Sequence, residues 1–488
     1  MIKLRLACLG ILAVIILSAP PFGANGYAQK RKGEKGERKG GQKHIFSGPA
    51  PSHPFDIILG RPTDKSITIS VMTNKDGTAQ IAYGHSPGKL DRSSAEQPLK
   101  KGEPFEFHLG ELTPDTRYFY RLKIRDGASG EFKSDEQRTF HTQRKPGSSF
   151  VFTVQADSHL DQATRPAVYD RTLANVLADK PDFHVDLGDT FMTDKYDKHT
   201  DALPQYIAQR YYFGKAAHSV PLFLVLGNHD GERLDRYDGT ETCMSVWSCR
   251  TRKLYFPNPY PDGFYTGNQA KKNHVDRLED YYAWEWGDAL FVGLNQFWTT
   301  TKPRRNNADG NWARTLGKDQ YDWLAKTLAQ SKAKYKFIFT HHLVGGLDDQ
   351  GRGGSEAAVL YEWGGKGKDG KDAFKEKRPG WAMPIHELLK KHHGSVVFHG
   401  HDHFFAKQDL DGMVYLMVPQ PGDPGSDRLR NVDEYGYIRG DFMPPSGHIR
   451  VSISPEQAKV EYVRSYLPQA ESEKRKNGQV GYSFMLKP

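Results

Sequence analysis

Cysteine is scarce in this sequence, which contains three among its 488 residues. Cys8 falls near the start of the chain, so Cys243 and Cys249 are the two that a folded domain would contain. Two thiolates are too few for a structural zinc site, which takes four ligands. In an oxidising compartment their spacing (CMSVWSC) is typical of a disulfide within a loop, and two free buried thiols are the alternative.

Long apolar runs are lacking as well. The run Leu6–Leu17 is about a dozen residues long, too short to span a bilayer comfortably. A basic start (MIKLR) precedes it and the small-x-small site Gly26-Tyr27-Ala28 follows it, so residues 1–28 are predicted to be a secretory signal peptide. An uncleaved N-terminal anchor is the alternative. No later segment is apolar enough to cross a membrane, and we expect a secreted or periplasmic protein.

Strong net charge is missing from most of the chain, although the total is +9. Residues 29–48 hold five Lys and two Arg against two Glu, and Lys3 and Arg5 lie in the predicted signal peptide. The remaining chain is close to neutral, which argues against nucleic acid as the main partner. Because residues 29–48 are rich in Lys and Gly and lack periodicity, we expect a basic, disordered linker there.

Residues 49–145 have the pattern of an all-β domain. Short strand-like runs such as Ser66–Thr73 and Tyr118–Ile124 are separated by turns. About seven such runs at intervals of roughly eight to twelve residues predict a β-sandwich. This part shows no catalytic constellation, and we interpret it as a structural or docking module.

Residues 148–467 have a different pattern, in which strands alternate with helical segments. The helical segments are Thr164–Asp179, Gly317–Gln330 and Met383–His393. This alternation predicts an α/β core. The later runs His448–Ile453 and Lys459–Arg464 predict a closing β-hairpin of a second sheet, which a four-layer α/β sandwich would accommodate. Residues 468–488 are predicted to be a C-terminal tail.

Five short apolar runs in this α/β region each end in metal-binding residue types. They are Phe150–His159, Phe183–Asp189, Leu222–Asp230, Phe337–His342 and Val396–His403. Buried strands have this appearance when they deliver side chains to a site at their C-terminal ends. Asp, Asn and His side chains from separate strands predict a dinuclear metal centre.

The polar ends of these runs resemble, in the same order, the conserved blocks of a known family. The blocks in this chain are Asp157-Ser158-His159, Gly188-Asp189, Gly227-Asn228-His229-Asp230, His341 and Gly400-His401-Asp402-His403. They resemble those of the calcineurin-like metallophosphoesterase superfamily. The resemblance covers roughly residues 148–467. In addition, Leu112–Leu122 (LTPDTRYFYRL) is similar to the corner sequence of fibronectin-III-like and purple-acid-phosphatase N-terminal domains.

The resemblance implies a set of ligands for two metal ions. It places Asp157, His159, Asp189 and His403 on one metal, and Asp189, Asn228, His341 and His401 on the other. A shared carboxylate allows two dications to lie about 3.5–4 Å apart. The resemblance also implies that a hydroxide bridging the metals attacks phosphorus, so that no Ser or Cys nucleophile is required.

Two histidines beside these ligands need separate consideration. His229 follows the ligand Asn228 and is the candidate general acid for the leaving group, with a purely structural histidine as the alternative. His341 and His342 point to opposite sides of a strand, so one of them should bind metal and the other should not. The family places the ligand directly after the apolar run, which favours His341.

The sequence departs from the purple acid phosphatases at two positions. That subgroup has a Tyr ligand of ferric iron three residues after the Gly-Asp carboxylate, where this chain has Met192, and a Gly where it has His159. Imidazole in place of phenolate suits Zn, Mn or ferrous iron, so we expect a colourless centre of two divalent ions. Asp194 keeps the subgroup's downstream carboxylate.

Together with the export signal, the resemblance implies an exported, metal-dependent phosphatase that hydrolyses small-molecule phosphate monoesters. A phosphodiesterase acting on nucleotides, nucleic acid or lipid head groups would use the same blocks, and a vestigial surface-binding protein is an alternative of another class. The Gly-rich segment Gly345–Gly380 lies between two ligand blocks, and we expect a long loop that covers the site. Its Arg352, Tyr361, Trp363, Lys377 and Arg378 are candidate substrate contacts.

Overall fold

The computed structural model describes residues 48–488 except 128–129, 162, 302–309, 424 and 426. The predicted signal peptide (1–28) and nearly all of the predicted linker (29–48) therefore lie outside the described residues. Among the helices that are described, none is long and apolar enough to cross a membrane.

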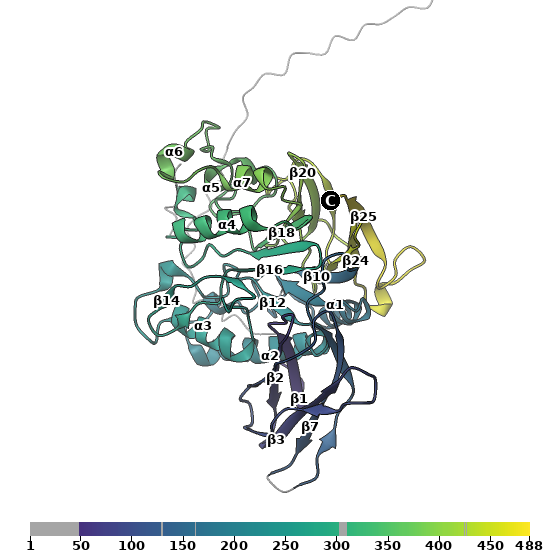
Figure 1. Cartoon of the computed structure of the whole chain (residues 1–488). Coiled ribbons are helices and arrows are strands. Elements are labelled where there is room, and N and C mark those ends of the chain that lie inside the picture. The colour runs from purple at the N-terminus through teal and green to yellow at the C-terminus, as the bar shows by residue number, and fades with distance from the viewer. Residues whose placement is uncertain (1–47, 128–129, 162, 302–309, 424, 426) are drawn as a thin grey trace, which may run out of the picture. The chain divides into compact units, whose positions relative to one another are not determined.

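The N-terminal part consists of two antiparallel sheets that share one core (Figure 1). Its strands are β1 Phe55–Gly60, β2 Ile67–Thr73, β3 Gly77–Gly84, β4 Arg92–Ser93, β5 Gln97–Leu99, β6 Phe105–Leu109, β7 Arg117–Arg125, β8 Lys133–Ser134 and β9 Arg138–His141. One sheet has the order β1-β2-β6, and the other β4-β3-β7-β8, with β5 paired to β3 and β9 to β7. Inward-facing residues of both sheets, such as Ile69 and Tyr118, form one buried cluster. The expected β-sandwich is thus present.

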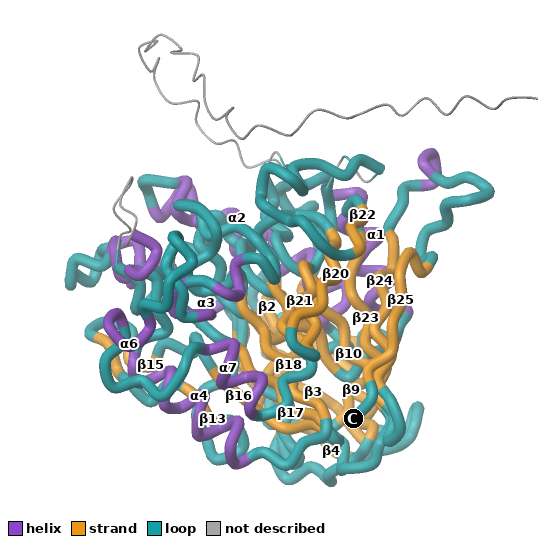
Figure 2. The backbone as a smooth tube through the Cα atoms, turned by 90° about the horizontal axis from the view of Figure 1, so that it is seen from above, coloured by secondary structure: helices purple, strands orange, loops and turns teal. Residues whose placement is uncertain are grey.

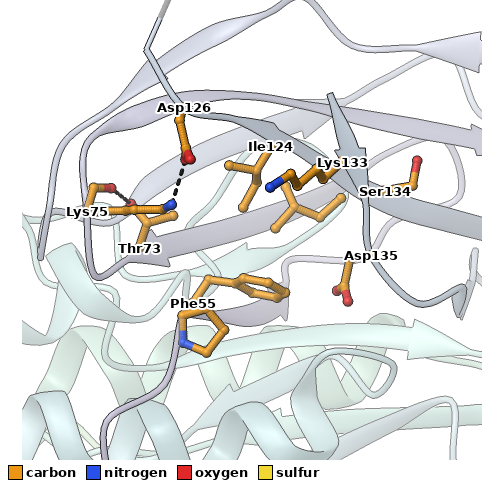
Figure 3. Close-up of a pocket in the computed structure, with 10 residues that line it drawn as sticks. Phe55, Thr73, Lys75, Ile124, Asp126, Lys133, Ser134 and Asp135 are labelled. Atoms are coloured by element: carbon orange, nitrogen blue, oxygen red, sulfur yellow. Dashed lines mark hydrogen bonds and ion pairs between the residues drawn. The ribbon is translucent and has the colours of Figure 1, made fainter. Parts of the chain in front are cut away.

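A cavity of about 250 Å³ opens in this sandwich. Figure 3 shows Phe55 and Ile124 on its apolar floor, and Lys75 at its rim, where the amine lies 2.6 Å from a carboxylate oxygen of Asp126. The cavity shares no residue with the histidine and carboxylate clusters described below.

The α/β part contains two further sheets packed face to face (Figure 2). The first has the order β12-β11-β10-β23-β24-β25. Its strands are β10 Phe150–Gln155, β11 Phe183–Asp186, β12 Leu222–Leu224, β23 Gly447–Ile453, β24 Ala458–Arg464 and β25 Val480–Leu486. Strands β10, β11 and β12 are parallel, and β23 to β25 join them antiparallel.

The second sheet has the order β13-β16-β17-β18-β19-β21-β20-β22. Its strands are β13 Thr266–Gly267, β16 Tyr282–Trp286, β17 Ala289–Gly293, β18 Tyr335–Thr340, β19 Val396–His399, β20 Phe405–Leu410, β21 Met413–Met417 and β22 Asp441–Met443. Strands β17, β18, β19 and β21 are parallel. A separate pair, β14 Lys271–Lys272 and β15 Asp276–Arg277, lies outside both sheets.

Helices cover the outer faces of the two sheets. They are α1 Pro166–Ala178, α2 His199–Ala217, α3 Met244–Tyr255, α4 Lys318–Gln330, α5 Tyr361–Gly364, α6 Phe374–Lys377 and α7 Ile385–Lys391, with 3₁₀ turns η1 Thr193–Lys195, η2 Leu234–Arg236, η3 Gly310–Ala313, η4 Ala357–Val359 and η5 Pro468–Ala470. Helices α1 and α2 pack in one cluster with β12, and α4 and α7 pack on the second sheet. The four-layer α/β sandwich predicted from the sequence is confirmed.

The centre of the α/β part is an aromatic core between the two sheets. The ring centroids of Phe152 and Phe291 are 5.1 Å apart at an interplanar angle of 88°, and Phe183 and Phe337 join the same cluster. Strands buried on both faces read as continuous apolar runs. This explains why five strands could be recognised from composition alone, and why their polar C-terminal residues stood out.

Two local expectations are wrong. Residues 468–488 are not a tail, because β25 hydrogen-bonds along β24 and extends the first sheet. Cys243 and Cys249 do not form a disulfide within a loop: Cys243 precedes α3, Cys249 lies inside it, and both are free buried thiols. Six positions along an α-helix rotate a side chain by roughly 240°, which points the two thiols apart.

Candidate metal centre

The ligand candidates all follow the C-terminal ends of parallel strands. Asp157 follows β10, Asp189 follows β11 and Asn228 follows β12; in the second sheet His341 follows β18, and His401 and His403 follow β19. The two sheets face each other, so these strand ends meet. Four of these residues have φ values between 53° and 81°, in the left-handed region: Asp157, Asp189, His401 and His403. Non-glycine residues adopt this conformation at a cost, typically at functional sites.

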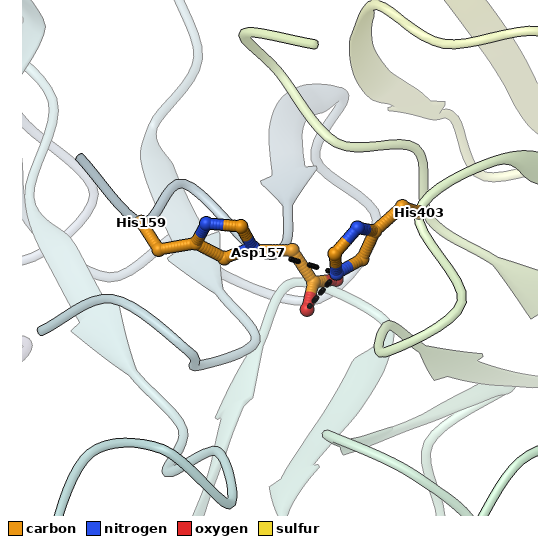
Figure 4. Close-up of side chains that lie close together, drawn as sticks. All are labelled: Asp157, His159 and His403. Atoms are coloured by element: carbon orange, nitrogen blue, oxygen red, sulfur yellow. Dashed lines mark hydrogen bonds and ion pairs between the residues drawn. The ribbon is translucent and has the colours of Figure 1, made fainter. Parts of the chain in front are cut away.

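The first cluster consists of Asp157, His159 and His403 (Figure 4). The Nε2 atom of His403 lies 3.5 Å from Oδ1 of Asp157 and 3.4 Å from Nε2 of His159. One ligand atom from each residue lies within 4.8 Å of the others. The Nδ1 atom of His159 is 3.0 Å from Oδ1 of Asp161, which holds the ring with Nε2 toward the cluster.

The second cluster consists of Asp189, His341 and His401. The Nε2 atom of His341 lies 3.2 Å from Oδ2 of Asp189 and 3.2 Å from Nδ1 of His401. The side-chain oxygen of Asn228 is 3.0 Å from the same Nε2 atom. The clusters adjoin, since His341 Nε2 is also 4.0 Å from Oδ1 of Asp157. The structure thus brings together all seven residues that the sequence singled out as ligands.

Each ligand carboxylate uses its two oxygens differently. One oxygen of Asp157 accepts the backbone N–H of His401 at 2.8 Å, and one oxygen of Asp189 accepts the backbone N–H of His229 at 2.7 Å. The other oxygen of each faces the histidine clusters. Each carboxylate therefore ties down a neighbouring ligand loop and keeps an oxygen for a cation.

The clusters fit a pair of metal ions by their chemistry. Asp157 is fully buried, yet its Oδ1 has no hydrogen-bond donor among the described residues. Burial disfavours a charged His341, but the charges of Asp189 and Asp157 outweigh it and raise the pKa of His341 to about 10. The site therefore attracts positive charge. Oxygen and imidazole donors without thiolate suit Zn, Mn or Fe.

The second histidine of the adjacent pair has a different environment. The Nδ1 atom of His342 is 3.0 Å from the carbonyl oxygen of Leu343 and 3.2 Å from Nε2 of Gln296. Gly351 packs on the ring: a Cβ there would lie 2.8 Å from His342 Cε1. Among the pair, only His341 belongs to a cluster, which agrees with the sequence-based preference. His184, within β11, contacts Thr153 Oγ1 at 2.8 Å instead of joining a cluster.

A carboxylate that the sequence analysis left without a role holds the ligand loops together. Asp230, the last residue of the Gly-Asn-His-Asp block, is buried and accepts backbone N–H groups from both ligand loops. The donors are Asp189, Thr190, Phe191 and Gly227. Asp186, at the end of β11, similarly accepts Gly188 N–H and the Thr190 hydroxyl. The signal that could have identified Asp230 was its place as the last residue of the motif.

The surface group His386, Glu387 and Asp411 also has ligand-like spacing. There, however, His386 Nε2 lies 3.1 Å from Asp411, and Lys390 lies 3.3 Å from the same carboxylate. An ammonium already neutralises this cluster, and we interpret it as an ordinary surface ion pair.

A family model for calcineurin-like phosphoesterases matches residues 150–405. The chain belongs to the calcineurin-like phosphoesterase family. The matched range contains every strand-end ligand named above, and the resemblance inferred from the sequence blocks is confirmed.

Two solved structures share the fold of this calcineurin-like phosphoesterase. The structure of PhoD has a TM-score of 0.61 at 15% identity, over 90% of this chain and 92% of that chain. Purple acid phosphatase PPD1 from yellow lupin (Lupinus luteus) seeds has a TM-score of 0.57 at 14% identity, over 88% of this chain and 74% of that chain. At these identities the likeness establishes fold alone. Among curated proteins, none matches this chain by sequence.

His229 lies at the edge of the phosphoesterase centre. Its Nδ1 is 2.8 Å from Oδ1 of Asp194, and its Nε2 is 4.0 Å from Oδ2 of Asp189. Burial lowers the pKa of His229, but the charges of Asp189 and Asp194 and the hydrogen bond to Asp194 outweigh this and raise it. The side chain keeps 25% of its surface exposed, so an incoming molecule can reach it.

A cavity of about 500 Å³ adjoins this edge. Its lining combines ligand-cluster and basic residues: Asp194, Asn228, His229, Arg233, Asp235, Arg236, Gln296, Phe297, Thr300, Arg314, His342, Asp349 and Gln350. The basic residues and Gln296 were not anticipated, because they come from loops without a recognisable motif.

The Gly-rich segment 345–380 is not the long, irregular cover that the sequence suggested. It contains η4, α5 and α6, and of its residues only Asp349 and Gln350 line the cavity. Trp363 is buried and donates to the Tyr415 hydroxyl at 2.9 Å, and Arg378 pairs with the buried Glu362. Of the expected substrate contacts, Tyr361, Trp363 and Arg378 instead help to build the core.

Proposed function

We propose that the protein is a metal-dependent phosphatase that hydrolyses small-molecule phosphate monoesters. The observation that carries this proposal is the pairing of His229 with Asp194 where the ligand clusters meet the cavity. The cavity provides space for a leaving group next to an imidazole that can protonate it. The cationic side chains Arg233 and Arg236 in its wall suit a dianionic monoester.

Different residues of the chain would bind the metal ions and transfer the proton. Two divalent ions held by the seven ligands supply Lewis acidity and water activation when bound. Asp194 orients the His229 ring through Nδ1, leaving Nε2 to protonate the ester oxygen as its bond to phosphorus breaks. Positioned proton transfer of this kind contributes roughly 10²–10⁴-fold.

The test is metal content measured alongside hydrolysis of a monoester and a diester. The purified protein should contain two metal ions and should hydrolyse p-nitrophenyl phosphate with a higher kcat/KM than bis-p-nitrophenyl phosphate. Dominant diester turnover would reassign the substrate class to phosphodiesters. Stoichiometric metal with no phosphoester turnover would indicate a vestigial, surface-binding protein instead.

We also propose that the protein is exported. The support is the basic start and the apolar run Leu6–Leu17 before a small-x-small site. Cell fractionation followed by N-terminal sequencing of the recovered protein tests this, and a chain that retains Met1 in the cytoplasm would contradict it.

A further inference from the structure

The cavity beside His229 contains a buried cation whose contacts are mostly backbone carbonyls. Arg314 is 7% exposed. Its Nη1 donates to the carbonyls of Gly345 (2.9 Å) and Asp348 (3.2 Å), and its Nη2 donates to that of Asp349 (2.7 Å). Within the described part of the chain, no carboxylate lies within ion-pair distance of this guanidinium. A buried guanidinium stays protonated, so it presents to the cavity a positive charge that no described carboxylate pairs with directly.

The nearby carboxylates are engaged elsewhere. The Asp348 carboxylate accepts the backbone N–H groups of residues 350, 351 and 352. Asp235 forms a bidentate pair with Arg233 at 2.9 and 2.8 Å, and Asp194 holds His229. Asp349 is exposed at the rim. Arg314 is therefore available to an anionic group of a bound molecule.

The same wall offers a buried hydrogen-bond acceptor. Gln296 is buried, and its Nε2 donates to the carbonyl of His342 at 2.8 Å, which fixes the orientation of the amide. Its Oε1 then has no donor among the described residues.

A buried cation next to an unfilled acceptor favours a ligand that carries both an anionic group and a hydroxyl. The anionic group would pair with the guanidinium, and the hydroxyl would donate to the Gln296 oxygen, since a buried acceptor without a donor is costly. A volume of about 500 Å³ exceeds what one phosphate group needs and falls within the usual range for organic ligands. Phe297 is the one aromatic side chain in this lining, so a polar occupant is favoured over an apolar one.

We propose that this cavity selects substrates whose leaving group is a polyol or sugar carrying a second anionic group, with Arg314 binding that anion and Gln296 accepting a hydroxyl. The inference rests on the proposed phosphatase function, which it makes more specific. Arg314 is thus a specificity-determining residue.

A matched set of monoesters tests the proposal with the metal-loaded, full-length protein. 6-Phosphogluconate and sorbitol 6-phosphate differ only by a carboxylate in place of a hydroxymethyl group at the far end of the chain. 6-Phosphohexanoate keeps the carboxylate and lacks the hydroxyls. Wild-type kcat/KM should be highest for 6-phosphogluconate, by about tenfold or more over each of the others.

The variant Arg314→Gln should abolish the preference for 6-phosphogluconate over sorbitol 6-phosphate. Its kcat/KM for p-nitrophenyl phosphate, which lacks the second anion, should stay within about twofold of wild type. Arg428→Gln removes the same charge from an exposed position outside the cavity and should preserve the preference. Gln296→Met should reduce the advantage of 6-phosphogluconate over 6-phosphohexanoate.

The outcomes separate this inference from the function on which it rests. Wild-type turnover of p-nitrophenyl phosphate without preference for 6-phosphogluconate overturns the inference and leaves the phosphatase function standing. Equal losses on all substrates in Arg314→Gln, with metal retained, would show that Arg314 only supports the loops. Hydrolysis of diesters alone would remove the phosphatase proposal itself.

If Arg314→Gln fails to fold, competition with p-nitrophenyl phosphate hydrolysis by the wild-type protein decides. 6-Phosphogluconate should inhibit at about tenfold lower concentration than sorbitol 6-phosphate. Equal inhibition by the two compounds overturns the inference.

Discussion

At the scale of single residues, the metal centre depends on carboxylates that perform two tasks at once. Asp189 binds the backbone N–H of His229 with one oxygen and faces His341 with the other. Its neighbour Asp230 fixes both loops through backbone N–H groups. A carboxylate with backbone donors on one side is held in position before any cation arrives, which reduces the cost of assembling the site.

The first prediction concerns Asp189. Replacement by Ala removes the oxygen shared by the two ligand sets, so bound metal and phosphoester hydrolysis should be lost together. Metal analysis by mass spectrometry with p-nitrophenyl phosphate turnover measures both. Asp197→Ala, at an exposed position in the same connection, is the control and should retain both. Full metal content in Asp189→Ala would contradict the ligand assignment.

The second prediction concerns His229 and its partner Asp194. His229→Ala should retain metal but lower kcat by about 10²–10⁴-fold for esters of alcohols, whose leaving oxygen needs a proton. The loss should be smaller for p-nitrophenyl phosphate, because p-nitrophenolate leaves readily without one. Asp194→Asn should show the same trend with smaller losses. A uniform loss across leaving groups would argue against a general acid.

At the scale of elements, parallel strands decide which side chains can meet. Strands β18 and β19 are hydrogen-bonded neighbours with Thr340 paired to His399, so the residues that follow them, His341 and His401, emerge side by side. The opposite sheet contributes Asp157 and Asp189 in the same way, from β10 and β11. Sequence periodicity could identify each strand. Which strand ends of one sheet face those of the other sheet, however, depends on how the two sheets pack together.

The third prediction concerns β25, the edge strand of the first sheet. Tyr482 packs 5.3 Å from the Phe405 ring, and Phe484 and Leu486 lie against the central core. Truncation after residue 479 should lower the free energy of unfolding by about 2–4 kcal/mol from lost apolar burial, which lowers Tm by several degrees. Thermal unfolding measures this effect.

Removal of residues 487–488, which lie beyond β25, is the matched control and should leave Tm unchanged. An unchanged Tm after truncation at residue 479 would mean that the segment behaves as a tail.

The fourth prediction links α1 to β23 through pH. Asp179 caps α1 and accepts from His448 Nε2 (2.8 Å) and Arg450 Nη1 (2.6 Å). Burial alone would raise the pKa of Asp179, but these partners outweigh it and lower the pKa. A depressed carboxyl pKa stabilises the fold above the unfolded value of about 3.9, and this stabilisation is lost as pH falls through the folded pKa.

Asp179→Asn should therefore lower the free energy of unfolding by about 1–3 kcal/mol at pH 7, and the difference from wild type should narrow as pH falls below about 4. Denaturant unfolding in the presence of chelator measures it without interference from metal release. Asp170→Asn removes the more exposed α1 ion pair with Lys215 and should cost less than about 1 kcal/mol. A difference independent of pH would contradict this assignment.

At the scale of the whole molecule, the sandwich is packed against the α/β part. Ile58 of β1 joins the cluster around α2. Arg210 of α2 is fully buried, pairs with Asp56 of β1 and donates to the carbonyl of Ser70 at 2.9 Å. Tyr120 of the sandwich donates to the carbonyl of His218 at 2.5 Å. This contact pattern favours a structural part over a detachable docking module.

The fifth prediction is that the two parts unfold together and that the buried pair couples them. Arg210→Met leaves the Asp56 carboxylate buried without its cation, so the free energy of unfolding should fall by about 3–5 kcal/mol. The double variant Arg210→Met/Asp56→Leu should recover part of this loss. Arg250→Met, which removes an exposed pair with Glu241, should change stability by less than about 1 kcal/mol. Two separate calorimetric transitions in the wild type would contradict the coupling.

The strands, their polar ends and the α/β class could be recognised from sequence alone, because these signals are local: a strand buried on both faces must be apolar, and Asp157, Asn228 and His403 stand shortly after one. The assignment of seven ligand candidates came from the resemblance of these strand ends to the blocks of a known family. Alternation along the strand showed that only one of His341 and His342 should bind metal, and the resemblance favoured His341.

Which residues surround the centre depends on how distant segments of the chain pack. Arg314 and Gln296 lie in segments without periodicity and reach the cavity because distant loops pack together. β25 is a strand because β24 offers it an unpaired edge, and Cys249 stays a thiol because a helix turns it away from Cys243. Each of these depends on contacts between residues far apart in the chain, and local composition contains no record of such contacts.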